Sequence, residues 1–91
     1  MKPMRPKQIL YTSHFLRQIK KIPGEEKKLL GKFEKIFRQD CFDCRLKTHK
    51  LSGKLDGFWA CSVSYKTRIL FEVGKDNVVT LNDIGSHDIY K

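Results

Sequence analysis

The strongest constraint on the fold of this 91-residue chain is a helical repeat of large apolar residues in its second quarter. These residues recur every three to four positions, so they share one face of a helix. They are Leu29, Leu30, Phe33, Ile36 and Phe37. Glu25 and Glu26 come just before them, and acidic residues in the first turn of a helix interact favourably with the helix dipole. The pattern predicts an amphipathic helix that begins at Glu25.

A second helix is predicted immediately before this one. Ser13 is of the residue type that caps helix N-termini, and the apolar residues behind it again share one helical face. They are Phe15, Leu16, Ile19 and Ile22. Pro23-Gly24 then ends the helix. A connection this short predicts an antiparallel hairpin of two helices.

Strands are predicted on both sides of the helices. One covers residues 8–11, and three more follow residue 57, where apolar residues alternate. The alternating residues are Trp59, Cys61, Val63 and Tyr65, then Ile69, Phe71 and Val73, then Val79 and Leu81. Residues 74–77 have the composition of a hairpin turn.

This order predicts one α+β domain over residues 1–91. An N-terminal strand precedes the antiparallel two-helix hairpin, and three antiparallel strands follow it. The helices pack on one face of the sheet, which leaves the other face free to hold a ligand.

A polar stretch without periodicity lies between the second helix and the later strands, and loops of this length are usually functional or mobile. It contains His49, followed by Lys50 and Lys54. We expect Leu51 and Leu55 to anchor the loop, while the imidazole and the two ammonium groups stay accessible to a phosphodiester. The alternative is a solvated basic loop without a ligand.

The charge is high and unevenly placed. The formal net charge is +9; residues 1–50 contain fourteen Lys and Arg against five Asp and Glu, whereas residues 51–91 contain five of each. Such a balance favours a polyanionic partner, which can be nucleic acid, an acidic protein or an anionic membrane surface. A basic protein without such a partner is the alternative.

Several classes of protein are excluded or disfavoured. No apolar run approaches the roughly 20 residues needed to cross a bilayer, and the first residues lack the apolar core of a signal peptide, so we expect a cytoplasmic protein without a membrane partner. The sequence contains no Walker loop, dinucleotide fingerprint, nucleophile elbow or zinc-protease motif.

The three cysteines do not suggest a disulfide framework, because their number is odd. Cys41 and Cys44 are spaced C-x-x-C, but a single pair is a weak zinc signal, and the thioredoxin-like context is missing. Cys61 lies on the core side of its predicted strand. We therefore expect no metal ion and no small-molecule cofactor.

Three residues in the last quarter can carry chemistry. Arg68 precedes the core-like residues of its strand by one position, so its planar guanidinium projects from the free face, where it can bind a phosphate. His87 and Tyr90 follow the last strand after Gly85, which permits a sharp bend. Imidazole transfers protons near neutral pH. The alternatives are a solvated edge arginine and a passive tail.

Five segments of the chain form a recognisable series in their order and spacing, namely Phe15–Pro23, His49-x-Leu51-x-Gly53, Gly57-x-Trp59, Tyr65–Phe71 and Ile84–Tyr90. Together they resemble the RelE/ParE superfamily of toxins from type II toxin-antitoxin systems, and specifically the RelE-like mRNA interferases. The resemblance covers nearly the whole chain.

The resemblance implies a metal-independent ribonuclease that enters the ribosomal A site, cuts mRNA by attack of the 2′-hydroxyl on the adjacent phosphate, and is neutralised by an acidic antitoxin. This chemistry needs a base, an acid and a cation at the phosphate. Carried over to this sequence, Arg68 binds the phosphate, His49 and His87 transfer protons, and Tyr90 orients the nucleotide or supports the acid. The candidates for binding the RNA backbone are Lys47, Lys50, Lys54 and Lys66.

Two positions depart from the pattern of the histidine-rich branch of these toxins. Ser62 stands where a further histidine occurs, and Lys66 stands where an acidic residue often precedes the strand arginine. Which histidine is the base and which the acid therefore stays open. A ParE-like inhibitor of DNA gyrase and a noncatalytic RNA-binding module are the alternatives. His87 and Tyr90 favour the nuclease, because a binding protein needs no proton-transfer groups there.

Overall fold

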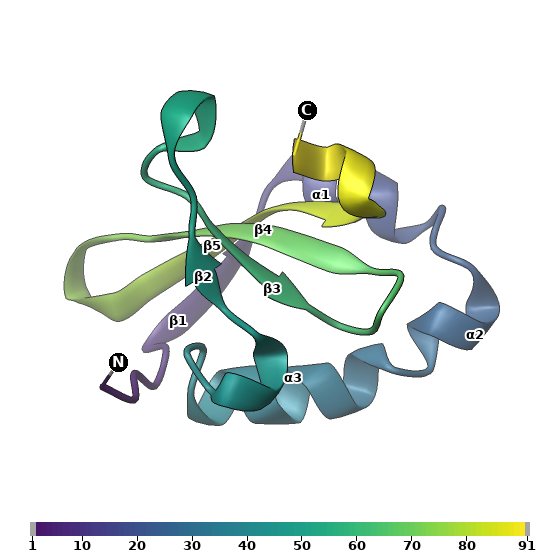
Figure 1. The fold of residues 1–91 in the computed structure, drawn as a ribbon. Helices are drawn as coiled ribbons and strands as arrows, with labels where there is room; N and C mark the ends of the chain where they lie inside the picture. The colour runs from purple at the N-terminus through teal and green to yellow at the C-terminus, as the bar shows by residue number, and fades with distance from the viewer. Residues whose placement is uncertain (1, 91) are drawn as a thin grey trace.

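The computed structural model describes residues 2–90, except for the side chains of His87 and Asp88. Its strands form one mixed sheet in the order β1-β5-β4-β3-β2 (Figure 1). They are β1 Gln8–Tyr11, β2 His49–Lys50, β3 Trp59–Ser62, β4 Arg68–Val73 and β5 Val78–Gly85. β1 runs parallel to β5, and the other neighbouring pairs are antiparallel. The predicted α+β class is confirmed, and β2 is a strand that the sequence pattern did not predict.

Three α-helices lie between β1 and β2, namely α1 Ser13–Ile19, α2 Gly24–Lys27 and α3 Leu30–Gln39. The structure also contains short 3-10 helices, which are η1 Cys44–Leu46, η2 Gly53–Leu55, η3 Lys75–Asn77 and η4 His87–Tyr90. No helix in residues 2–90 is long and apolar enough to span a bilayer.

The predicted boundaries of the helices are wrong at three places, one of which is the end of α1 at Ile19 rather than at Ile22. Thr12 rather than Ser13 is the N-cap of α1, because the Thr12 hydroxyl accepts a hydrogen bond from the Phe15 backbone N–H at 3.0 Å. The second predicted helix is divided into α2 and α3. Each part packs elsewhere, since Glu26 of α2 bonds to the β3–β4 connection, whereas α3 lies on the sheet.

The helices α1 and α3 cover the same face of the sheet. Their buried aromatic residues join the core-facing residues of β3, β4 and β5 in one cluster. Its members include Phe15, Phe33, Phe37, Cys61, Ile69, Phe71, Val79 and Leu81. Phe37 of α3 meets Phe71 of β4 edge-on, with ring centroids 5.1 Å apart. The opposite face of the sheet, which α1 and α3 leave uncovered, carries Arg68.

The polar stretch before β3 is more ordered than the sequence suggests. It contains η1, β2 and η2, and β2 adds the edge strand to the sheet. Cys41 and Leu46 are its fully buried anchors, whereas Leu51 and Leu55 are only half-buried. A strand of two residues is too short to produce a visible alternation, which explains why the pattern missed it.

The chain ends in η4, which packs on β4 and β5 (Figure 1, yellow). A Cβ atom at Gly85 would lie 2.8 Å from Cγ2 of Ile89. Gly85 does not have a positive φ. The chain bends at Ser86, directly after Gly85, and the lack of a side chain at Gly85 permits the close approach of the C-terminal turn.

Candidate active site

Arg68 is fixed at the start of β4 on the open face of the sheet. It pairs with Ser62 of β3 and with Gly85 of β5. Its Nη1 donates hydrogen bonds to the carbonyl oxygens of Ser64 and Tyr65 at 2.5 and 2.9 Å. Two carbonyl groups on one nitrogen set the direction of the planar guanidinium group.

The C-terminal turn brings Tyr90 next to Arg68. Burial raises the pKa of the Tyr90 phenol, while the charge of Arg68 and a hydrogen bond with it lower the pKa by a smaller amount. The phenol is therefore protonated at neutral pH and can donate a hydrogen bond. His87 lies in the same turn, but its side chain is outside the described residues, and so is the predicted position of its imidazole.

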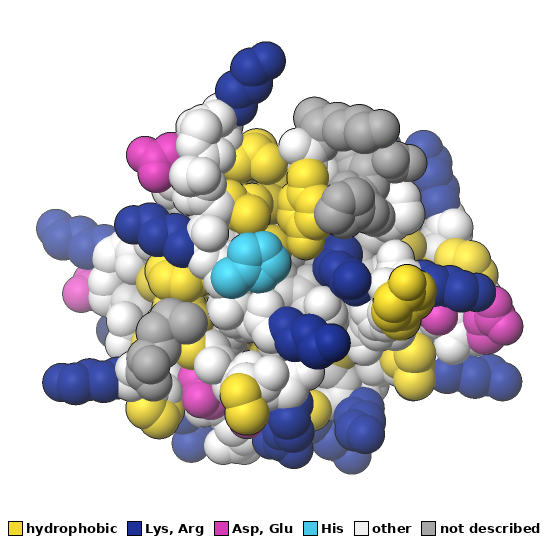
Figure 2. Space-filling model, in the orientation of Figure 1, with side chains coloured by type: hydrophobic (Ala, Val, Ile, Leu, Met, Phe, Trp, Pro, Cys, Tyr) yellow, Lys and Arg dark blue, Asp and Glu magenta, His cyan; other side chains and the backbone are white. Residues whose placement is uncertain are grey.

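A surface groove of about 250 Å³ opens beside Arg68. It is lined by Arg45, Lys47, Ser62, Val63, Ser64, Tyr65 and Arg68. Asp43 neutralises part of the charge of Arg45 through an ion pair of 2.9 Å, whereas Lys47 is exposed at the surface. Figure 2 shows one face of the molecule with a histidine (cyan) near its centre and Lys and Arg side chains (dark blue) beside it.

His49 lies on the same face as Arg68 but across β3. It pairs with Ala60, and Arg68 pairs with Ser62, two residues further along β3. Strand spacing and rise then put the α-carbons of His49 and Arg68 about 12 Å apart. Their side chains can reach one phosphodiester from two sides. Nδ1 of His49 lies 3.0 Å from the carbonyl oxygen of Lys47, so Nδ1 is the donor and Nε2 of the neutral ring is the acceptor.

The predicted RNA-binding lysines are not all gathered on this face. Lys50 pairs with Trp59, a residue of the core-facing row, so the register places it opposite to His49. Lys54 is exposed in η2, and Lys66 is exposed in the β3–β4 connection. Of the four lysines, Lys47 shares a groove with Arg68.

Two of the three cysteines, Cys41 and Cys61, have the environment of packing residues. Cys41 and Cys61 are fully buried, and Cys44 is exposed. Burial raises the pKa of Cys41 to about 12 and also raises that of Cys61. Both buried thiols are therefore protonated at neutral pH, and metal binding or redox exchange needs the thiolate. No group of three or more His, Cys, Asp or Glu in the described part of the chain is placed to hold a metal ion.

A buried carboxylate, that of Glu26, bonds to the turn next to Arg68 and was missed by the sequence analysis. The Glu26 carboxylate accepts hydrogen bonds from the hydroxyl groups of Ser64 and Thr67. These two hydrogen bonds lower the pKa of Glu26. The sequence analysis explained Glu26 by its favourable place in the first turn of a helix, so it suggested no tertiary partner for the carboxylate. The hydroxyl-rich sequence between β3 and β4 was the signal that could have suggested one.

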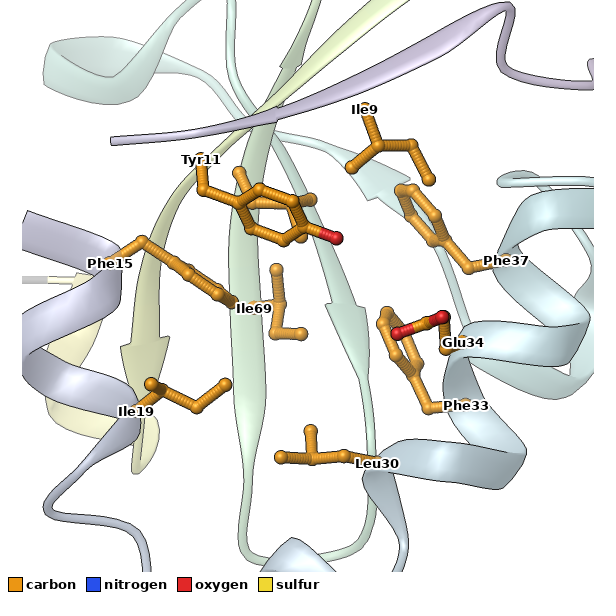
Figure 3. Close-up of a pocket in the computed structure, with 10 residues that line it drawn as sticks. Ile9, Tyr11, Phe15, Ile19, Leu30, Phe33, Glu34, Phe37 and Ile69 are labelled. Carbon is orange, nitrogen blue, oxygen red and sulfur yellow. The ribbon is translucent and has the colours of Figure 1, made fainter. Parts of the chain in front are cut away.

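A second hollow lies on the other side of the sheet, between α1 and α3 (Figure 3). Phe15 and Ile19 of α1 face Leu30 and Phe33 of α3 across it, and Ile69 of the sheet lies between them. Leu16 and Leu29 of the same helical region are 50% and 39% exposed. This groove is apolar, in contrast to the basic groove at Arg68.

The chain matches no protein-family model, and no curated protein sequence matches it. Solved structures match its fold over most of its length. A chain of the RelBE2 toxin-antitoxin complex from Mycobacterium tuberculosis has a TM-score of 0.76 at 16% identity, covering 96% of this chain and 98% of that one.

Two further matches have the same architecture. In the DinJ-YafQ toxin-antitoxin complex from Escherichia coli, the TM-score is 0.72 at 14% identity, with 94% and 97% of the two chains covered. A YoeB/ParE toxin from Agrobacterium tumefaciens gives 0.71 at 13% identity, with 88% and 98% covered. The fold is therefore that of the RelE/YafQ/YoeB/ParE toxins of type II toxin-antitoxin systems, as the resemblance implied.

Proposed function

We propose that this protein is a ribosome-dependent mRNA endoribonuclease and the toxin of a type II toxin-antitoxin system. The observation that supports this most is the pair of Arg68 and Tyr90 on the open face of a RelE-like sheet, beside a basic groove. The guanidinium group is held in one direction before any ligand binds. A fixed cation and a protonated phenol in a partly buried corner suit a phosphate that gains charge during reaction.

The proposed reaction is attack of an RNA 2′-hydroxyl on the adjacent phosphorus. Nε2 of His49 takes the proton of the 2′-hydroxyl, the O2′–P bond forms, and the P–O5′ bond breaks. The products are a cyclic 2′,3′-phosphate and a 5′-hydroxyl, whose oxygen takes a proton from His87 or from Tyr90. Arg68 donates to the nonbridging oxygens, where negative charge accumulates. These residues supply the base, the acid and the cation that the reaction needs.

His49 is assigned as the base because of its tautomer. The hydrogen bond from Nδ1 to the Lys47 carbonyl leaves the Nε2 lone pair available to take a proton. Lys47 and Lys54 then contact the RNA backbone, and each phosphate neutralised steepens the salt dependence of binding by about 0.7 in the log-log slope for a single strand.

The proposed partner is an antitoxin with an acidic amphipathic segment. The exposed surface of the helical region carries most of the positive charge of the first half of the chain, at Arg17, Lys20, Lys21, Lys27, Lys28, Lys32, Lys35 and Arg38. The groove lies between α1 and α3, two of the helices that carry these cations, and can take the apolar face of such a segment. Of the three matched structures described above, two are toxin-antitoxin complexes.

Co-purification with the product of the neighbouring gene tests this partner. We expect a complex at low salt that Tyr11→Glu weakens, because Tyr11 lines the groove and is 43% exposed, so a carboxylate there repels acidic side chains. Lys75→Ala, in the turn between β4 and β5, is the matched control and should bind normally. No complex at low salt would contradict the antitoxin assignment.

The nuclease is tested in a translation system programmed with one mRNA, with new 5′ ends mapped by primer extension. Wild-type protein should produce cuts within A-site codons, and Arg68→Ala and His87→Ala should produce far fewer in the same time. Lys75 follows the end of β4 that is opposite to Arg68, so Lys75→Ala should cut mRNA normally. Intact mRNA with the wild-type protein would contradict the proposal. Inhibition of gyrase supercoiling would then support the ParE-like alternative, and salt-dependent RNA binding without new ends the noncatalytic one.

A further inference from the structure

Glu26 is a buried carboxylate that belongs to neither the sheet nor the groove. It lies in the four-residue helix α2 and is 8% exposed. Its Oε1 accepts hydrogen bonds from Ser64 Oγ and from Thr67 Oγ1, the latter at 2.6 Å. Among the residues that the structure describes, Glu26 forms no salt bridge. Burying a carboxylate is costly unless hydrogen bonds replace its water, and here two hydroxyl groups do so.

Ser64 links Glu26 to the backbone of the connection between β3 and β4. Its hydroxyl oxygen accepts hydrogen bonds from the backbone N–H groups of Lys66 and Thr67, both at 3.1 Å. The backbone N–H groups of Val63 and Ser64 in turn donate to the Thr67 carbonyl oxygen at 2.9 and 3.3 Å. One side chain in α2 therefore meets the centre of a closed turn.

Packing of the turn's own side chains cannot replace this contact. Tyr65 is 93% exposed, and Lys66 is also exposed. Of the four residues from 64 to 67, Thr67 is the fully buried one, and its hydroxyl bonds to Glu26. The hydrogen bonds that Ser64 and Thr67 donate to Glu26 thus fix the position of the turn against α2.

The turn at residues 64–67 also determines where the guanidinium group of Arg68 points. The carbonyl oxygens of Ser64 and Tyr65 both accept from Arg68 Nη1. If the turn moved, those two acceptors would move with it, and the guanidinium group would regain the rotamer freedom of a long side chain. Errors of about 1 Å at a reacting group are costly in catalysis.

We propose that Glu26 is a positioning residue, which holds the 64–67 turn so that its carbonyl groups aim Arg68 at the scissile phosphate. The catalytic consequence rests on the proposed nuclease function. The ordering of Arg68 does not, because it is a property of the free protein. An effect on Arg68 separates this role from a general contribution to stability.

The test compares Glu26→Gln with Glu26→Leu. Glutamine keeps an amide oxygen that can accept both hydroxyl groups, whereas leucine fills a similar volume without an acceptor. Glu25→Leu is the matched control, because Glu25 is the exposed neighbour in the same helix. Two readouts are needed: the Arg68 side-chain signals in ¹⁵N NMR of the free protein, and kcat and KM for mRNA cleavage on ribosomes.

We expect Glu26→Leu to broaden or shift the Arg68 signals and to lower kcat about tenfold with KM unchanged. Glu26→Gln and Glu25→Leu should retain both. In an Arg68→Ala background, Glu26→Leu should lower kcat less than twofold, because the residue acts through Arg68. If Glu26→Leu does not fold, Thr67→Val removes one of the two hydrogen bonds to Glu26, leaves those within the turn, and should shift the Arg68 signals in the same direction.

Unchanged Arg68 signals in both Glu26→Leu and Thr67→Val would overturn the proposal. A loss of kcat of equal size with and without Arg68 would also overturn it, because it would show a merely structural role. A wild-type protein with ordered Arg68 signals but no cleavage would instead contradict the nuclease assignment and leave the positioning role supported.

Discussion

Arg68 and His49, which we propose to act on the same phosphate, are held in different ways. Arg68 lies in the inner strand β4, between β3 and β5, and two carbonyl oxygens of a turn fixed by Glu26 hold its guanidinium group. His49 lies in a two-residue edge strand, is exposed, and makes one hydrogen bond to a carbonyl group nearby in the chain.

The difference separates two tasks within one site. Stabilising charge in a transition state requires donors that do not reorganise, so the residue for this task belongs in the most rigid part of the fold. A proton-transfer group needs a correct tautomer and an approach to its substrate, and its hydrogen bonds often tighten only when substrate is bound. The comparison indicates that the phosphate-binding half is formed in the free protein and that RNA completes the other half.

Removal of Arg68, the residue that is fixed in the free protein, should have the largest effect on the cleavage rate. We expect Arg68→Ala to lower the cleavage rate about 10³-fold, since loss of one transition-state donor costs two to three orders of magnitude. Arg68→Lys should recover only part of this rate, because an ammonium group lacks the planar fork. Single-turnover cleavage on ribosomes measures both.

The control for this variant is Arg38→Ala. Arg38 pairs with Glu34 on the exposed surface of α3, at 3.1 Å, so its loss should leave the cleavage rate unchanged. A fall of less than tenfold for Arg68→Ala would remove Arg68 from the reaction and would end the comparison with His49.

Removal of the exposed half should cost less. We expect His49→Gln to lower the cleavage rate about 10²-fold, at the lower end of general base catalysis, and to leave the melting temperature unchanged. His14→Gln is the matched control, because His14 is also exposed but lies on α1, where Nε2 is 3.1 Å from Asp83. Equal losses in the two variants would show that His49 has no special role.

A smaller effect is expected where the tail meets the sheet. Gly85→Ala places a Cβ atom 2.8 Å from Ile89 and should displace the C-terminal turn that carries Tyr90. We expect about a tenfold loss of cleavage rate, estimated as the loss of one positioning interaction, and a fall of the Tyr90 pKa as its burial decreases, measured by phenolate absorbance.

Gly31→Ala is the control for this change. A Cβ atom at Gly31 meets nothing within 4 Å, and alanine is the better helix former, so the variant should be more stable by about 0.5–1 kcal/mol with unchanged cleavage. If Gly85→Ala cleaves RNA at the wild-type rate, the tail does not contribute to the site.

The alternation in β4 explains which part of this site could be predicted. Ile69 and Phe71 required a core face, so the position of Arg68 on the opposite face followed from the sequence alone, and the structure agrees. The apolar faces of the helices and the turn at residues 74–77 could be predicted for the same reason, because each follows from residues close together in the sequence.

The contacts that hold Arg68 could not be predicted in this way. Glu26 lies 38 and 41 residues away from its partners Ser64 and Thr67, and no local pattern records a hydrogen bond over that distance. The same applies to the pairing of His49 with Ala60, because β2 is too short to show a period. The residue types that can do chemistry were visible, whereas the contacts that orient them depend on tertiary structure.

The smallest expected effect concerns the scaffold alone. The Thr12 hydroxyl accepts from the Phe15 N–H and donates to the Asn82 carbonyl oxygen at 3.1 Å, which ties the start of α1 to β5. We expect Thr12→Ala to lower the free energy of unfolding by about 1 kcal/mol, as loss of an N-cap does. Urea denaturation measures this change, and the cleavage rate at a temperature where the variant is folded should not fall.

Ser13→Ala is the decisive partner of this variant, because Ser13 is the cap that the sequence suggests. Its side chain should contribute within about 0.5 kcal/mol, as exposed positions generally do. Equal destabilisation by both variants would place the start of α1 at Ser13 after all. A fall in the cleavage rate of folded Thr12→Ala would show that α1 and the Arg68 corner are coupled through β5, which pairs with β4 at Gly85 and Arg68. The rigidity of that corner would then depend on the whole sheet rather than on the turn that Glu26 holds.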